Sequence, residues 1–223
     1  MKNKKHSLKN IKTNISEIVI WDAVSPYNSS SSSGMLNQFT TQRQGFNGDI
    51  AMLLSYQASG GIAYVNGLCS SNPDYSMSFS SIASSYQDVP TYSWSVMVVT
   101  HEFGHLLTLN SSQIRPTTKK NQREGELYLT HEGEAYKNSY INRFVDLFWK
   151  GNLLTSWDTI QREYCYTEAN CVEKLYDLYQ NNSSEFLTDY AAESPEEDIV
   201  ESWTAFVLRP KVRRARTIAH KKI

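Results

Sequence analysis

Apolar positions in the first ninety residues fall in short runs separated by turn residues, a pattern typical of strands. One helical period interrupts these runs, from Met35 up to Gly45. The serine-rich stretch 70–90 predicts a loop. The apolar runs predict strands at Glu17–Ala23, Asp49–Gln57 and Gly61–Cys69.

After Pro90 the apolar positions recur every three and four residues, so the remainder of the chain is predicted to be largely helical. The last helix has a strong start, because Ser194 can cap it, Pro195 suits the first helical position, and acidic residues follow. The predicted helices lie at 93–107, 139–151, 170–182 and 194–208.

These elements divide the chain into four parts. Residues 1–15 are predicted to be a disordered lead-in, and residues 209–223 a solvated basic tail. Between them, residues 16–108 are expected to form a lobe that contains the sheet, and residues 109–208 a helical lobe.

The composition is that of an ordinary globular protein: of 223 residues, 40% are apolar and 20% charged, with a net charge of −1. This balance argues against a nucleic-acid partner, and no run of 18 apolar residues predicts a membrane span. The basic N-terminus lacks a following apolar stretch of signal-peptide length, so either an export signal is missing or the protein stays inside the cell.

The sequence contains three cysteines. Cys165 and Cys171 are close enough in the sequence to form a disulfide, and the alternative is that these two and Cys69 are all reduced thiols.

The stretch "VVTHEFGHLL" carries the H-E-x-x-H pattern of zinc peptidases. His101 and His105 are four residues apart, so both imidazoles project from one helix face and can bind one ion at about 2.0–2.1 Å. Glu102 points to the side, where it can act as general base, and Gly104 allows another element to approach closely. The alternative is a chance match, or a core helix whose two histidines bond elsewhere. Catalytic zinc needs a third protein ligand.

Residues 17–107 resemble the reprolysin-type metzincin peptidases of bacterial secreted proteins. The stretches "GDIAMLLS", "GGIAYVNGLC" and "SFSSIASSYQDVPTYSWSVMVVTHEFGH" carry the resemblance. It implies an α+β zincin-like fold, with a twisted mixed sheet packed on the helix that bears the histidines. It also implies that an edge strand lines the cleft and binds an extended peptide by strand addition. The residues of that strand are Gly61, Ile62, Ala63, Tyr64 and Val65.

The metzincin pattern stops after His105. It requires a glycine and a third histidine further along, and this sequence has Thr108 and Ser111 at those positions. The methionine turn of that family is also missing, because the last methionine is Met97. The third ligand must therefore come from elsewhere in the chain. The remaining histidines are His6, His131 and His220, of which only His131 lies outside the basic ends.

Residues 109–207 resemble gluzincin-type peptidases, a group that includes lethal factor-like and other bacterial zinc metallopeptidases, and the stretch "DYAAESPEEDIVESWTAFV" carries the resemblance. It implies that Glu197 is the third ligand and that Glu201, on the same helix face, braces a ligand histidine. Glu196 is the nearest rival, and these acidic residues could instead serve only the helix dipole. Tyr190 matches a tyrosine that faces the reacting carbonyl in such peptidases, with a packing role as the alternative.

Together these features predict a zinc-dependent endopeptidase in which Zn²⁺ activates a water and Glu102 is the general base. The alternatives are a zincin-fold binding or structural protein without turnover, and a zinc hydrolase of small substrates. We expect a protein or peptide substrate, no nucleic-acid partner, a monomer, and a location outside the cell or in the cell envelope. Whether the join between the two resemblances is natural, recombined or designed stays open.

Overall fold

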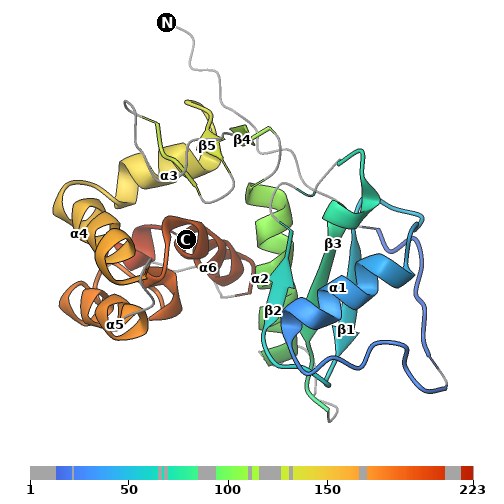
Figure 1. Cartoon of the computed structure of the whole chain (residues 1–223). Coiled ribbons are helices and arrows are strands. Elements are labelled where there is room, and N and C mark those ends of the chain that lie inside the picture. The colour runs from blue at the N-terminus through green and yellow to red at the C-terminus, as the bar shows by residue number, and fades with distance from the viewer. Residues whose placement is uncertain are drawn as a thin grey trace, which may run out of the picture.

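The computed structural model describes residues 14–21, 23–64, 67, 70–84, 94–109, 112–115, 127–130, 133–165, 170–208 and 217–222. Within these ranges the chain combines helices with a three-stranded and a two-stranded sheet (Figure 1). The strands are β1 Ala51–Ser55, β2 Gly61–Ala63, β3 Met77–Ser81, β4 Ile114–Arg115 and β5 Glu134–Ala135. The helices are α1 Ser32–Gln42, α2 Trp94–Thr108, α3 Tyr140–Phe148, α4 Asn152–Ile160, α5 Cys171–Asn181 and α6 Pro195–Leu208.

β3 lies in the middle of the larger sheet, parallel to β1 and antiparallel to β2. Its side chains alternate between the two faces. Met77 and Phe79 join a buried cluster with residues of α1. Ser78 and Ser80 point to the opposite face, against which α2 packs. β2 is left at the edge of the sheet, beside α2, so the predicted mixed sheet on the histidine helix is confirmed.

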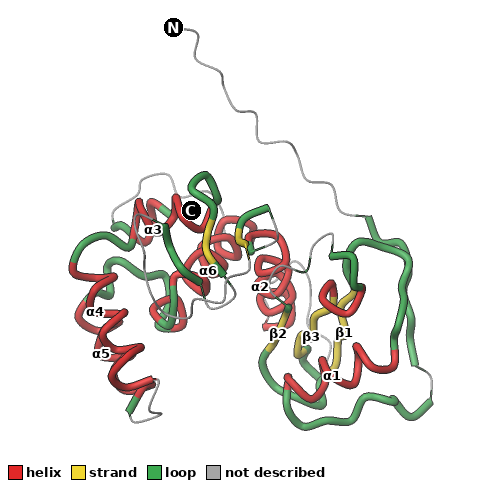
Figure 2. The backbone as a smooth tube through the Cα atoms, turned by 45° about the horizontal axis from the view of Figure 1, so that its top comes forward, coloured by secondary structure: helices red, strands yellow, loops and turns green. Residues whose placement is uncertain are grey.

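α2 lies between the sheet and the helical part of the chain, as Figures 1 and 2 both show. Its other side packs closely against α6 because Gly104 has no side chain. A Cβ at Gly104 would lie 2.9 Å from both Trp203 Cδ1 and Val200 Cγ1. α6 joins α3, α4 and α5 in a buried cluster around the ring of Trp149. This arrangement confirms the α+β zincin-like fold. No described helix has both the length and the apolar character of a bilayer span.

The predicted helices are confirmed as α1, α2, α3, α5 and α6, with ends that differ by a few residues. α4 was not predicted. The sequence predicts that a helix ends at Gly151. In the structure this glycine has a positive φ of 61°, and the chain continues directly into a further helix. The predicted division into two lobes stays a prediction.

One strand prediction and one loop prediction are wrong. The described part of Glu17–Ala23 forms no strand, and the side chains of Ile18 and Ile20 are largely exposed. Conversely, β3 lies within the stretch 70–90 that was predicted as a loop. The error has a physical reason: serine is a small side chain that fits the space beneath α2, so β3 has only two apolar residues, Met77 and Phe79, within a serine-rich stretch. β1 and β2 are confirmed but shorter than predicted, and Val65 and Cys69 lie outside the described residues.

The prediction of a solvated basic tail is wrong for Lys222, whose side chain is fully buried. Its ammonium group forms an ion pair with the carboxylate of Asp198 on α6. A buried charge is tolerated when an opposite charge compensates it, and the sequence of the tail alone does not reveal that partner. The rings that surround the ammonium group are Phe144, Phe148 and Phe186.

Candidate metal centre

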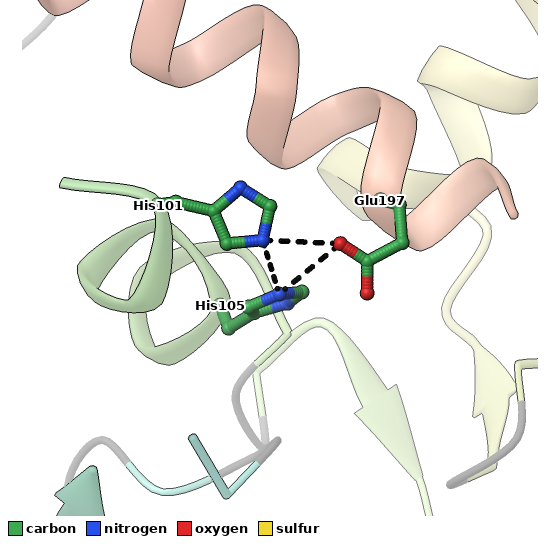
Figure 3. A group of neighbouring side chains, drawn as sticks. All are labelled: His101, His105 and Glu197. Atoms are coloured by element: carbon green, nitrogen blue, oxygen red, sulfur yellow. Dashed lines mark hydrogen bonds and ion pairs between the residues drawn. The ribbon is translucent and has the colours of Figure 1, made fainter. Parts of the chain in front are cut away.

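The two histidines of the H-E-x-x-H pattern lie on one face of α2, as their spacing predicts. Both are buried, and the centroids of their rings lie 4.8 Å apart. The Nε2 atoms of His101 and His105 are separated by 3.1 Å and point to the same place (Figure 3). Two ring nitrogens therefore converge beside this helix.

α6 brings a carboxylate to that place. The helix begins as its sequence predicts, with Pro195 as its first residue and Ser194 Oγ accepting a hydrogen bond from Glu197 N at 3.1 Å. Glu197 therefore lies in the first turn of a helix that packs against α2 where Val200 and Trp203 meet Gly104. Its Oε2 atom is 3.1 Å from His101 Nε2 and 3.5 Å from His105 Nε2 (Figure 3).

The three convergent atoms have the spacing and chemistry of a metal site. Zinc–ligand distances of about 2.0–2.2 Å in a tetrahedron place neighbouring ligand atoms roughly 3.3–3.6 Å apart. The separations here are 3.1, 3.1 and 3.5 Å, so one lies within this range and two lie just below it. Two imidazoles and one carboxylate form a set that zinc binds in hydrolases. Among the described residues, only these three form such a group of potential metal ligands.

Glu201 orients one of the two imidazoles. Its Oε1 lies 2.9 Å from His101 Nδ1, and its Oε2 accepts a hydrogen bond from Thr188 Oγ1, also at 2.9 Å. Since a carboxylate can only accept, His101 carries its proton on Nδ1 when neutral, and its Nε2 lone pair faces the site. The sequence resemblance placed Glu201 in this role. Thr188 was missed, because a single threonine in a loop carries no spacing signal.

Glu102 is buried between α2 and the edge strand. Gly61 on β2 makes room for it, since a Cβ at that position would lie 2.0 Å from Glu102 Oε1. Burial raises the pKa of the Glu102 carboxyl to about 7, although the neighbouring His105 and His101 act to lower it. A carboxyl group with a pKa near neutrality can both take up and release a proton.

The open edge of β2 runs past this carboxylate. Gly60 O accepts from Ser81 N at 2.8 Å, and Tyr64 N donates to Met77 O at 3.4 Å, so these backbone groups face β3. Because hydrogen-bonding direction alternates along a strand, the N–H and C=O groups of Gly61 and Ala63 face the free edge. Of the predicted substrate-binding residues, Gly61 lies against Glu102, and Ile62, Ala63 and Tyr64 follow it along the chain.

Tyr190 lies in a short 3₁₀ turn, Tyr190–Ala192, just before α6. The centroid of its ring is 5.7 Å from that of His101. Burial and the carboxylates around it raise the pKa of Tyr190, so its phenol stays protonated and able to donate a hydrogen bond. The structure thus brings this residue next to the candidate ligands.

The rival third ligands are placed differently. Glu196 is buried, and its Oε2 accepts a hydrogen bond from Tyr128 Oη at 2.8 Å. It does not join the convergent group of Figure 3. His6 and His131 lie outside the described residues, as does the side chain of His220. Thr108, where the metzincin pattern has glycine, donates from Oγ1 to the carbonyl of Gly104 at 2.8 Å.

A comparison with protein families gives this geometry a family context. A reprolysin-type model described as metallo-peptidase family M12 matches residues 2–125, more than half of the chain. The chain belongs to this family. M12 peptidases usually use zinc, so the M12 assignment and the convergent group point to the same kind of metal. The M12 match includes α2 and ends before α6, and neither a curated protein nor a solved structure matches the chain.

The metal-free site of this M12 peptidase is expected to hold a proton that zinc must displace. Burial alone would lower the pKa of His101, but hydrogen bonds to Glu197 and Glu201 outweigh it and raise that pKa to about 10. Zinc binds the neutral imidazole, so binding at pH 7 should release about one proton. Calorimetric titration in two buffers of different ionisation enthalpy measures this number. Equal heats in both buffers would contradict the expectation.

Proposed function

We propose that this M12 family member is a zinc-dependent endopeptidase whose ligands are His101, His105 and Glu197. One observation carries the proposal: two helices far apart in the sequence direct three ligand atoms to a single point. A chance H-E-x-x-H match, or two core histidines that bond elsewhere, gives no reason for a carboxylate to complete the group.

The residues around this point have the chemistry that amide hydrolysis needs. Zinc, when bound, lowers the pKa of a water molecule and polarises the scissile carbonyl. Glu102 takes a proton from the attacking water and returns it to the leaving amine, which its pKa of about 7 favours. Tyr190 donates its phenolic hydrogen to the oxyanion that develops on the carbonyl oxygen.

We infer that the substrate is an extended peptide that pairs with the free edge of β2. The backbone groups of Gly61 and Ala63 supply the hydrogen bonds, and specificity pockets are not needed for this step. Gly61 also lies directly against Glu102, so a peptide on this edge passes the general base. Strand addition favours internal bonds of unfolded chains over small isolated amides.

The proposed location is outside the cell or in the cell envelope. Cys165 and Cys171 form a disulfide, and disulfides persist in oxidising compartments. The reprolysin-type family assignment supports the same location. Reduction with a thiol, followed by mass measurement of alkylated peptides, tests whether this pair is oxidised in the protein from its natural source.

Activity on an unfolded protein tests the proposed function. The purified chain should cleave casein at internal bonds, lose this activity with a metal chelator, and regain it when zinc is added. A small chromogenic amide should be cleaved far more slowly, because it cannot pair with β2 along its length. If zinc binds tightly and no cleavage is detected with any peptide library, the chain is a binding or structural protein instead.

A further inference from the structure

The buried polar atoms that have no hydrogen-bond partner among the described residues include Ser80 Oγ and Glu102 Oε2. The side chain of Ser80 is fully buried on β3. A buried hydroxyl without a partner costs free energy, and alanine would fill nearly the same space without that cost. We therefore looked for a polar group near Ser80 with which its hydroxyl can form a hydrogen bond.

The strand register places the two groups next to each other. Ser80 pairs directly with Gly61 across the antiparallel ladder, and paired residues project from the same face of a sheet. On that face the position of a Gly61 side chain is taken by Glu102, whose Oε1 lies 2.0 Å from the ideal Cβ. Neither atom has a partner among the described residues, so the two groups are not bonded to each other in the structure. Cross-strand Cβ positions are about 4.5–5.5 Å apart, a separation that a rotation of the hydroxyl or one bridging water closes.

We propose that Ser80 is a positioning residue for the general base, donating a hydrogen bond to the carboxylate of Glu102. This inference rests on the proposed endopeptidase function. Glu102 lies one residue from a ligand histidine and occupies the space opened by Gly61 on its sheet side. A fixed donor on that side holds the carboxylate in one rotamer, with its remaining lone pairs turned to the attacking water.

Ser78 provides a matched control. It lies two residues before Ser80 on the same face of β3, is also fully buried, and its Oγ also has no partner among the described residues. Its cross-strand neighbour is Ala63 instead of Gly61, so no glycine opens space for Glu102 beside it. If serine serves only to pack β3 beneath α2, the two positions should respond alike to alanine.

The experiment compares S80A with S78A in the zinc-loaded enzyme. S80A should lower kcat for peptide cleavage roughly tenfold, with KM and zinc content unchanged, because only the orientation of the base is lost. S78A should retain the kcat of the unsubstituted enzyme. S80C and S80T, which keep a donor, should restore part of the lost kcat. A purely structural role of Ser80 would instead give equal losses in S80A and S78A, or no rescue.

A second measurement does not depend on turnover. If the two side chains interact, the changes in Tm caused by S80A and E102Q should not add in the double variant, whereas those of S78A and E102Q should add. Additive shifts for both pairs overturn the proposal even in an active enzyme. An unsubstituted chain that cleaves nothing overturns the endopeptidase function itself, and with it the role of Ser80.

Discussion

Replacement of Glu102 by glutamine is expected to lower kcat/KM for peptide hydrolysis by about three orders of magnitude while zinc remains bound. The amide has nearly the same shape as the carboxylate but cannot accept the proton of the attacking water. Glu102 does not belong to the convergent ligand group, so the metal site should persist. The measurement combines steady-state kinetics on an internally quenched peptide with metal analysis of the same sample.

Glu193 offers a matched control for this substitution. It is an acidic residue just before α6, close enough to Glu197 that the two carboxylates influence each other, and it has no part in the proposed reaction. E193Q should therefore keep most of the activity. If E102Q cleaves peptides as fast as the unsubstituted chain, Glu102 is not the base. If E102Q is inactive because its zinc is gone, the substitution has disturbed the ligands and the assignment of the base fails.

The sequence predicted the local part of the site well, because that part depends on spacing within single helices. Four-residue spacing puts His101 and His105 on one helix face, and the order of serine, proline and acidic residues predicts the start of α6. Each of these features is decided by helix geometry and by the hydrogen-bonding groups at a helix end. Neither requires knowledge of residues elsewhere in the chain.

The meeting of α2 with α6 could not be derived from spacing. Only a family resemblance suggested Glu197, and the structure adds the physical reason for its proximity, which is the close contact of α6 at Gly104. Thr188 and Lys222 were missed for the same kind of reason. Their partners, Glu201 and Asp198, lie 13 and 24 residues away in the chain and become neighbours only after packing.

β3 shows a different limit of sequence analysis. A strand is recognised by alternation over several residues, and β3 offers only two apolar positions, Met77 and Phe79, because its face toward α2 carries the small hydroxyls of Ser78 and Ser80. A stretch rich in serine has the composition of a loop, so the sequence analysis assigned this one to a loop. The same two residues suit a helix that approaches the sheet closely, so the error in the prediction falls on the strand that pairs with β2, beside the general base.

Replacement of Glu197 by glutamine is expected to weaken zinc binding by at least about a hundredfold and to abolish peptidase activity at trace zinc. The loss of a direct ligand should exceed the 10–100-fold typical of residues that only support ligands. Burial acts to raise the pKa of Glu197, but the two histidines outweigh it and lower this pKa to about 2. The unsubstituted carboxylate is therefore ionised at all physiological pH values. An amide supplies neither the charge nor a comparable ligand oxygen.

Two further variants separate this ligand assignment from its rivals. Glu196 is a buried residue in the same helical turn, and its carboxylate accepts a hydrogen bond from Tyr128. The E196Q protein should therefore keep its zinc. H131A removes the only other histidine outside the basic ends of the chain and should also keep zinc. Competition with a chromogenic chelator gives the zinc affinity of all three proteins under the same conditions. Loss of zinc in H131A or E196Q, together with full binding by E197Q, would assign the third ligand elsewhere, because removal of a true ligand cannot leave the affinity unchanged.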